Sequence, residues 1–563
     1  MKIRAWLKSG DAFIWVNAAA ASASIIAVLG LLLILFVNAF DHFWPSDVRA
    51  FSYVDPRSQQ VMQVLGSTVD EETVSQEQLV GAGIDKPLMV EKPLYHRTLV
   101  KLGNRDVTGV DFAWFIEEQV TAQHYPDGVM QFERKEWGDF FGFLREVRRG
   151  DEVVAVHQGE DILTEETRAV FDELFARARV IDNDINRLEK KVIASINYRV
   201  EQIRLSLLRL ERDQPAGWEV LRQQLIGERE MLQASFEVAK KQLFAQYEAI
   251  ERDSVVMQTM DGRLVEIPLS KILRVLTPNQ LNGVQKLGSY FVKFWAFLSE
   301  SPREANTEGG IFPAIFGTVL MVIIMTVVMM PMGVIAALYM HEYANQGAFI
   351  RFIRIAINNL AGVPSIVYGV FGLGFFVYMI GGSIDTLFYP EVLPAPTFGT
   401  PGLLWASLTL ALLTLPVVIV STEEGLSRIP RELREGSLAL GATRAETLRH
   451  IILPSASPAM MTGMILAVAR AAGEVAPLML VGVVKLAPTL PLNGNFPYLH
   501  LEQKFMHLGF HIYDVGFQSP NIEAGRPLVF ATAFLLVVVI VALNWMAVLL
   551  RNRLREKYQA NDV

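Results

Sequence analysis

The 563-residue sequence contains no cysteine, which excludes a disulfide framework, a cysteine nucleophile and a thiolate metal site. This absence does not fix the redox compartment. Two chemical motifs are missing as well: there is no G-x-x-x-x-G-K-[ST] segment for ATP hydrolysis and no H-E-x-x-H segment for zinc. His507 and His511 lie four residues apart, but we expect an incidental pair, because Gly509 between them weakens a helix. The sequence therefore predicts a protein that is not an enzyme and holds no metal or cofactor.

Charged residues are scarce in about half of the chain. Residues 41–310 hold 33 of the 51 Lys and Arg and 44 of the 59 Asp and Glu residues. The whole chain is nevertheless 51% hydrophobic, with a mean hydropathy of +0.30. This split predicts a polar insert within an apolar protein and excludes a simple soluble enzyme. Because the insert is acidic and would repel phosphate backbones, a nucleic-acid binder is excluded too.

Long apolar stretches predict six membrane-spanning helices, since about 20 mostly apolar residues are needed to cross a bilayer. The first stretch follows Lys2, Arg4 and Lys8 but is too long for a signal peptide, so we interpret it as an uncleaved span. The fifth alone contains charges, Arg470 and Glu474. The predicted spans are 13–40, 311–340, 355–381, 401–421, 458–483 and 527–550.

Basic residues outside the insert are distributed unevenly between the two sides of the membrane. When both termini are placed in the cytoplasm, the cytoplasmic segments carry 14 Lys and Arg residues and the short outer loops carry three. By the positive-inside rule, we expect residues 1–12 to be cytoplasmic and residues 41–310 to lie on the outer side of the cytoplasmic membrane.

The insert, residues 41–300, is predicted to be an α+β domain that carries a helical hairpin. Short strand-like runs and turn signals alternate over residues 41–160. Two arms, Thr164–Asp213 and Trp218–Asp253, repeat apolar residues at heptad spacing, with one four-residue insertion. This pattern is typical of an antiparallel coiled coil. A rigid self-packed hairpin and a partner-binding arm both fit it.

The cytoplasmic segment 422–457 contains a motif with fixed spacing. Glu435 is followed by Gly441, and then by the run Ile451-Ile-Leu453-Pro454. We expect two short helices joined by a tight turn at Gly441, because glycine has no Cβ to clash there. Pro454 is expected to end the second helix and to redirect the chain into the membrane.

This segment resembles the coupling loop of binding-protein-dependent ABC importers, whose pattern is E-A-A, three residues, G, nine residues, I-x-L-P. Residues 301–563 are also similar to the permeases of PstA-type phosphate importers, over 316–344, 355–372 and 469–477. The resemblance implies an α-helical polytopic membrane protein with a type I ABC importer permease core and no ATPase site. Five residues occupy the positions of the coupling motif: Glu435, Gly441, Ile451, Leu453 and Pro454.

The resemblance also implies partners and a pathway. The partners are a second permease subunit of the PstC type, a dimeric ABC ATPase that binds ATP and docks on the coupling loop, and an external phosphate-binding protein. Arg470 and Glu474 would belong to the phosphate pathway. A guanidinium suits phosphate, and charges within spans usually face a pathway or a partner. The alternative is an i, i+4 ion pair that only neutralises itself against a neighbouring helix.

Three other functions are weighed against phosphate import. An ABC permease for another oxyanion, molybdate or sulfate, would carry the same loop. A secondary transporter or channel would also place ionisable residues in its spans, but would not need a coupling loop. A membrane receptor fits the external insert but not six spans.

Overall fold

The computed structural model describes residues 11–84, 92–519 and 522–559. The chain divides into two compact units, close to the limits predicted at residues 41–300 and 301–563. The strand-rich unit comprises Phe43–Leu298 and Pro302–Gly310, and the helical unit comprises Met1–His42, Ser299–Ser301 and Ile311–Val563. The basic residues predicted to precede the first span lie outside the described residues.

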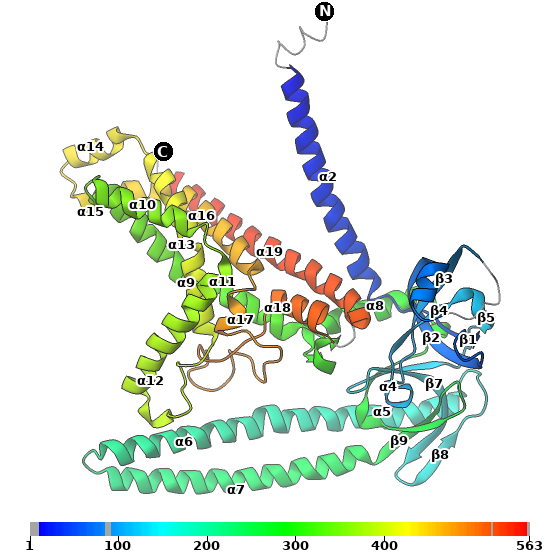
Figure 1. Ribbon diagram of the computed structural model, residues 1–563. Helices are drawn as coiled ribbons and strands as arrows, with labels where there is room; N and C mark the ends of the chain where they lie inside the picture. Colours follow the sequence, from blue (N-terminus) through cyan, green and yellow to red (C-terminus); the bar gives the residue numbers. More distant parts are fainter. Residues whose placement is uncertain (1–10, 85–91, 520–521, 560–563) are drawn as a thin grey trace, which may run out of the picture. The chain divides into compact units, whose positions relative to one another are not determined.

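Six helices among the described residues are long and apolar enough to cross a membrane, and all belong to the helical unit (Figure 1). Some are single α-helices, and others continue through a widened π-helical turn. Their segments are α2 (Asp11–Asp41); α9 (Phe312–Leu338) with η6 (Tyr339–Tyr343); α11 (Ser365–Phe371) with η7 (Gly372–Gly381) and α12 (Gly382–Phe388); α13 (Leu403–Ser427); α15 (Arg444–Thr447) with η9 (Leu448–Ile452) and α16 (Leu453–Gly473); and α19 (Ile522–Gln559).

The third span begins later than the predicted range of 355–381. Residues 355–360 belong to a separate helix, α10 (Ala348–Leu360), and the helical pattern restarts only at Ser365. The reason lies in Pro364, which occupies the N-cap position of α11. Proline lacks an N–H group and disfavours helical geometry in the residue before it, so one helix cannot run through this point.

The fifth span differs from its prediction at both ends. Helical structure runs without a break from Arg444 to Gly473, so Pro454 does not end a helix. Pro454 lies in the first turn of α16, directly after the π-helical turn η9. In a regular α-helix the proline ring would clash with the preceding turn, and the wider hydrogen-bond spacing of η9 avoids this clash. At the other end, the predicted range 458–483 is cut short at Gly473, and a separate short helix, α17 (Leu478–Val481), follows.

The centre of the helical unit is α13, which packs between α9 and α16. In the apolar stretch of α13, 67% of the residues are buried, against 0% in that of α2. Two glycines allow the helices to approach closely: a Cβ atom at Gly333 would lie 2.7 Å from a Val418 methyl carbon, and one at Gly463 would lie 2.8 Å from the Ser421 Cβ atom. These contacts fix the position of α13 against both neighbours.

The strand-rich unit contains two larger antiparallel sheets. The first has the order β4-β3-β2-β1-β5, and the second has the order β10-β9-β7-β6-β11, with β8 paired to β7. Phe132 and Phe140 of the second sheet are fully buried in one cluster with Phe171 and Leu174 of the adjoining helix α5 (Glu165–Arg187). The strands are β1 (Val48–Val54), β2 (Val61–Ser75), β3 (Leu94–Lys101), β4 (Phe112–Ile116), β5 (Val120–His124), β6 (Met130–Arg134), β7 (Asp139–Arg149), β8 (Glu152–Val156), β9 (Asp253–Gln258), β10 (Leu264–Pro268) and β11 (Ile272–Leu276).

The predicted helical hairpin is confirmed as two long antiparallel arms (Figure 1). Polar contacts cross between them in reversed order: Glu189 accepts a hydrogen bond from Tyr247, and Arg199 pairs with Glu228 at 2.7 Å. The first arm widens into a π-helical turn, η2 (Leu188–Ile193), within the stretch where the heptad spacing contains its four-residue insertion. The remaining segments are α5 (Glu165–Arg187), α6 (Ala194–Asp213) and α7 (Trp218–Glu251).

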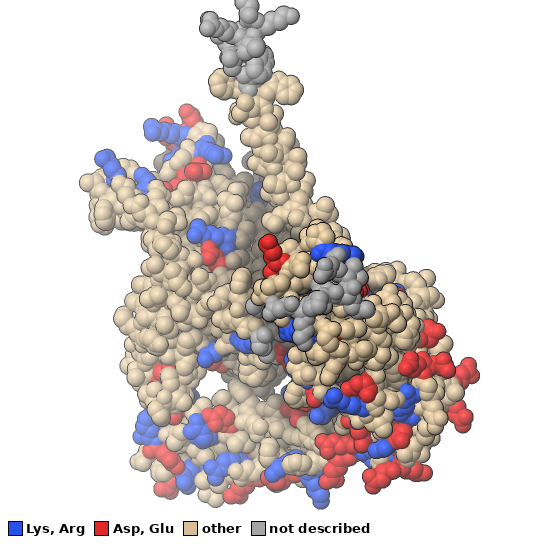
Figure 2. Space-filling model, turned by 45° about the vertical axis from the view of Figure 1, so that its right-hand side comes forward, with Lys and Arg blue, Asp and Glu red and all other residues tan. Residues whose placement is uncertain are grey.

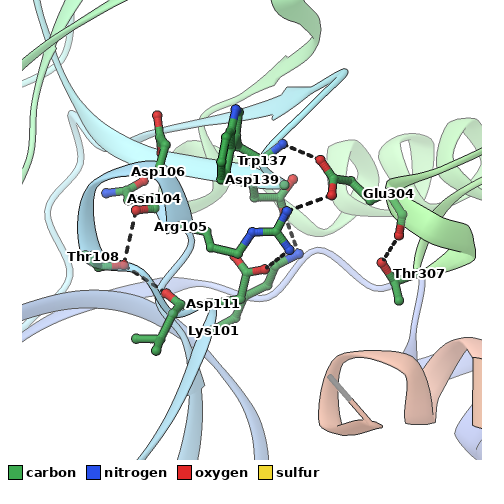
Figure 3. A network of polar contacts seen from close by, with 12 residues as sticks. Lys101, Asn104, Arg105, Asp106, Thr108, Asp111, Trp137, Asp139, Glu304 and Thr307 are labelled. Carbon is green, nitrogen blue, oxygen red and sulfur yellow. Dashed lines mark hydrogen bonds and ion pairs between the residues drawn. The ribbon is translucent and has the colours of Figure 1, made fainter. Parts of the chain in front are cut away.

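Residues 302–310, which precede α9 in the chain, are bound into the strand-rich unit by a polar network (Figure 3). Glu304 accepts from the Arg105 guanidinium at 2.7 Å and from the backbone N–H of Trp137. Lys101 forms a 2.7 Å ion pair with Asp139 in the same network. The short helix α4 (Arg105–Thr108) and the loop before β7 are therefore tied to this segment by charge.

The division of charge that the composition predicts is visible on the surface. Figure 2 shows red and blue side chains gathered over the strands and the hairpin, whereas the spanning helices present mainly uncharged side chains. The exposed side chains of α2 include Phe13, Ile14 and Trp15, each more than 60% exposed. Apolar exposure of this kind suits a lipid environment and not water.

Candidate functional site

Residues 422–457, which we call the coupling segment, contain two short helices joined by a tight turn, as predicted. The first helix, α14 (Arg431–Ala439), ends in a backbone pattern that requires Gly441 at a φ of 87°. The Gly441 N–H donates to the Leu438 carbonyl at 3.0 Å, and the Ala442 N–H donates to the Ser437 carbonyl at 3.2 Å. These two bonds form a Schellman motif, in which an L-residue with a side chain would be strained at position 441.

A capping box starts the second helix of this segment. The Thr443 side chain accepts from the Glu446 N–H, and the Glu446 carboxylate accepts in return from the Thr443 N–H at 2.7 Å. A further hydroxyl contact of 2.9 Å joins Ser437 of α14 to Thr447 of α15. Our sequence interpretation missed this cap, although the T-x-x-E spacing is a readable signal for it.

The outer surface of the coupling segment is apolar and unusually exposed. Leu440 is 91% exposed, and Leu433 and Leu438 are 48% and 44% exposed. Glu435 and Gly441, two of the predicted site residues, are exposed on the same segment. A projecting leucine cluster beside charged residues is the kind of surface that another protein covers.

The other three residues of the motif lie at the entry to the fifth span. Ile451, Leu453 and Pro454 are half-buried, and Ile452 between them is fully buried. Leu453 packs against a buried cluster that includes Leu338 of α9 and Leu426 of α13. The motif therefore joins an exposed loop to the packed ends of three spanning segments.

Arg470 and Glu474 lie together at the C-terminal end of α16, but they do not share a helix. The helix ends at Gly473, and Glu474 has an extended backbone with ψ near 130°, which corrects the predicted i, i+4 helical pair. The Nε atom of Arg470 lies 3.5 Å from the Glu474 Oε1 atom. In the part of the chain that the structure describes, the Arg470 guanidinium makes no hydrogen bond. Its side chain is 36% exposed, so its N–H donors are accessible.

Residues 475–477, which follow Glu474, pack closely against glycines of two other elements. A Cβ atom at Gly369 of α11 would lie 2.7 Å from the Pro477 Cα atom. One at Gly509, in α18 (Leu508–Tyr513), would lie 2.5 Å from a Val475 methyl carbon. The predicted role of the glycine cluster in close packing is confirmed for Gly369 and also for Gly372. It does not hold for Gly374, because nothing lies within 4 Å of the Cβ position there.

His507 and His511 are both buried at one end of α18, with 1% and 2% of their surfaces exposed. The Gly509 N–H donates to the His507 Nδ1 atom at 3.1 Å. Across residues 11–84, 92–519 and 522–559, no group of three or more His, Cys, Asp or Glu side chains is arranged to hold a metal ion. Gly509, which lies between the two histidines in the chain, is the residue that packs against Val475.

Comparisons with known proteins place the helical unit in a family. Residues 329–556 match the family model described as "Binding-protein-dependent transport system inner membrane component". The phosphate transport system permease protein PstA of Mycobacterium leprae is 33% identical over 225 residues, which are 39% of this chain and 68% of that protein. PstA 1 of Mycobacterium tuberculosis strain H37Rv is 31% identical over 287 residues, 51% of this chain and 82% of the relative.

A third relative is the probable ABC transporter permease protein YqgH of Bacillus subtilis, 32% identical over 38% of this chain and 67% of that protein. A solved structure of the MetNI methionine ABC transporter aligns with 47% of this chain and 97% of its own, at 18% identity and a TM-score of 0.31. The assignment of the family rests on the sequence relatives. By its matching residues and by these relatives, the chain belongs to the family of inner membrane components of binding-protein-dependent transport systems.

Proposed function

We propose that this protein is the permease subunit of an ATP-driven ABC importer that carries inorganic phosphate across the cytoplasmic membrane. The observation that carries the proposal is the coupling segment, which presents exposed leucines on a glycine-turned loop at the packed ends of the spans. Relatives named as phosphate transport permeases supply the substrate class. Import of another oxyanion, molybdate or sulfate, is the second candidate.

Energy would come from a dimeric ABC ATPase seated on the coupling segment. Leu433, Leu438 and Leu440 would fill a groove on that partner, since burying their exposed apolar surface favours association. A second permease subunit of the PstC type would complete the pathway. An external phosphate-binding protein would deliver the substrate.

The proposed orientation places both termini in the cytoplasm and residues 41–310 on the outer side of the membrane. The excess of basic residues in the cytoplasmic segments supports it. The same orientation puts the coupling segment on the side where ATP is available.

Arg470 and Glu474 would form a transient binding site in the phosphate pathway. The guanidinium offers a fork of N–H donors that matches a phosphate oxygen pair, and it is only loosely held by Glu474 at 3.5 Å. Glu474 would compete with phosphate for Arg470, so that the anion is held and then released.

Uptake of labelled phosphate by vesicles containing the assembled complex tests this function. We expect ATP-dependent uptake that unlabelled phosphate suppresses and that excess sulfate or molybdate leaves unchanged. Suppression by sulfate or molybdate, together with uptake of that anion, would replace phosphate by the second candidate. An absence of ATP-dependent uptake of all three anions would overturn the importer proposal.

A further inference from the structure

Helix α14 of the coupling segment has almost no apolar attachment to the rest of the protein. None of its nine residues is buried, and its leucines project outward. Arg434 and Ser437 are its half-buried residues, and both make polar contacts. A force applied to α14 from outside can therefore pass into the spans through these two side chains, in addition to the short backbone connections to α13 and α15.

Arg434 connects α14 to two spanning segments at once. Its guanidinium lies 2.9 Å from the Glu342 carboxylate, in the π-helical turn η6 that ends the second span. It also donates to the Leu426 carbonyl at 2.9 Å, in the last turn of α13. The Arg434 and Glu342 side chains are 22% and 16% exposed, so bulk solvent screens this ion pair only in part.

Glu342 is itself positioned by His341, its neighbour in η6. The Glu342 carboxylate lies 2.9 Å from the His341 Nδ1 atom, and the other ring nitrogen of His341 lies 3.3 Å from the Ser427 hydroxyl of α13. The carboxylate is therefore oriented by contacts other than the one with Arg434. Such preorganisation means that a displacement of the guanidinium pulls on two spans and not on one mobile side chain.

The same end of α13 carries a second ion pair. Arg354 of α10 pairs with Glu423 at 3.1 Å, one turn before Ser427. Figure 1 shows α10 and α14 at the same end of the helical unit. This pair does not touch α14, which makes it a matched reference for the contact between Arg434 and Glu342.

We infer that Arg434 and Glu342 are positioning residues that transmit the movement of α14 to the second and fourth spans. This inference rests on the proposed function, because it takes the external force on α14 to come from the ATPase. It adds a defined contact to the coupling motif, at residues outside the five that the sequence indicated. Ser437 and Thr447 would provide the corresponding link to the fifth span.

The first test is a double-mutant cycle in the assembled, reconstituted complex, with ATP hydrolysis and transport measured together. Arg434→Gln and Glu342→Gln should each lower phosphate uptake about tenfold at unchanged assembly, with a higher number of ATP molecules hydrolysed per phosphate. Arg434→Gln should lose at least as much uptake as Glu342→Gln, because it also removes the hydrogen bond to the Leu426 carbonyl. The double variant should show the same loss as Arg434→Gln alone, because the contact with Glu342 is already absent there. Arg431→Gln, on the same helix but exposed, is the matched control and should retain uptake.

The inference is overturned if the single variants retain the wild-type ratio of ATP to phosphate, or if their losses multiply in the double variant. Arg354→Gln and Glu423→Gln serve as a reference for a general effect on the fold at this end of the spans. An equal rise in the ATP ratio in these two variants would also overturn it.

A second measurement needs no transported substrate and so separates this inference from the phosphate proposal. Because the sequence has no cysteine, Leu440→Cys and Tyr343→Cys can carry two spin labels without background. Both side chains are exposed, at 91% and 52%. In the isolated chain, we expect a narrow distribution of distances between the two labels, and we expect Glu342→Gln to broaden it. Equal distributions with and without Glu342 would refute the inference even if phosphate transport is normal.

Discussion

Arg470 and Glu474 differ from an ordinary helical ion pair because the helix ends between them. Arg470 belongs to the last turn of α16, whereas Glu474 has an extended backbone. Their closest atoms are 3.5 Å apart, longer than the distance of about 2.8 Å expected for a strong charge-assisted hydrogen bond. The Arg470 donors are thus available to an anion, while the carboxylate stays close enough to compete.

Replacing Arg470 should affect transport more than assembly. We expect Arg470→Leu to lower phosphate uptake by at least about tenfold, because it removes the charged donors from the proposed pathway, and Arg470→Lys to keep part of the activity. Uptake by the reconstituted complex is the measurement. Arg351→Leu, at an exposed position of α10, is the control and should leave uptake unchanged. Normal uptake by Arg470→Leu in an intact complex would remove Arg470 from the pathway.

Glu308 illustrates how burial acts on a single residue of the strand-rich unit. Burial raises the pKa of the Glu308 carboxyl to about 7, against the opposing effect of the positive Lys101 and with support from the negative Asp139. Arg303 and Asp111 act on the same group with opposite signs. Because the folded unit binds this proton more tightly than the unfolded chain, the stabilisation is complete below pH 4.5 and is lost as the pH rises through about 7.

The stability of the strand-rich unit should therefore fall between pH 5 and pH 8. We expect Glu308→Gln to remove about 1–3 kcal/mol of this pH dependence in the free energy of unfolding, since an amide does not ionise. Thermal unfolding of the full chain in detergent, followed at both pH values, measures the effect. Glu71→Gln, at an exposed position, should keep the wild-type dependence. An unchanged slope in Glu308→Gln would mean that other groups carry the titration.

At the scale of elements, α14 and the hairpin both project from a base that is packed against the rest of their unit. Helix α14 is fixed by polar side chains because none of its residues is buried. The hairpin is anchored by Phe171, Leu174 and Ile185 of α5, with Ile250 at the end of α7, in the core of the second sheet. In both cases the outer part of the element can meet a partner without disturbing the base.

The exposed leucine of the coupling segment should decide the binding of the ATPase. Leu440→Glu places a charge where we propose apolar contact, and we expect about a tenfold or larger loss of ATPase subunit recovered with the purified permease. The fold should be unaffected because Leu440 is 91% exposed. Met231→Glu, at 67% exposure on α7, is the matched control and should retain the ATPase. Equal recovery with both variants would show that Leu440 does not touch the partner.

The hairpin arms can be shortened without removing their base. Replacing residues 193–242 with a short Gly-Ser turn keeps the buried residues of α5 and Ile250. If the arms retain a phosphate-binding protein, we expect normal uptake at saturating phosphate but a several-fold higher KM. Uptake measured over a range of phosphate concentrations tests this. Unchanged kinetics would favour a rigid self-packed hairpin without a partner.

At the scale of the whole molecule, the chain combines a charged unit suited to water with an apolar unit suited to a membrane. The strand-rich unit and hairpin carry most of the charge, whereas α2 and the other spans expose apolar side chains. The strand-rich unit lies in sequence between the first two spans, so the chain enters this unit from the first span and leaves it into the second. Its side of the membrane follows from the placement of these two spans.

Membrane-impermeant thiol labelling can test the proposed orientation, because the natural chain offers no cysteine to react. A cysteine at Met231 should react in intact cells, and one at Arg351 should react only after the membrane is permeabilised. Both side chains are exposed in the structure, and neither lies in the surface proposed to bind the ATPase, so a difference in labelling reports their side of the membrane. Labelling of Arg351→Cys in intact cells would reverse the proposed topology.

The sequence alone was sufficient for the six apolar spans, the helical hairpin and the Gly441 turn, because each depends on local composition or on contacts between neighbours in the chain. The break at Pro364 was also readable from the sequence, because proline disfavours a continuous helix, although our predicted span ran through it. The π-helical entry of Pro454 and the extended backbone of Glu474 depended on how the helices pack, so the limits predicted there shifted. Only the tertiary structure brings Arg434 to Glu342, which are 92 residues apart in the chain. A contact of that range leaves no periodicity in the sequence, since it is decided by where two helix ends meet in space.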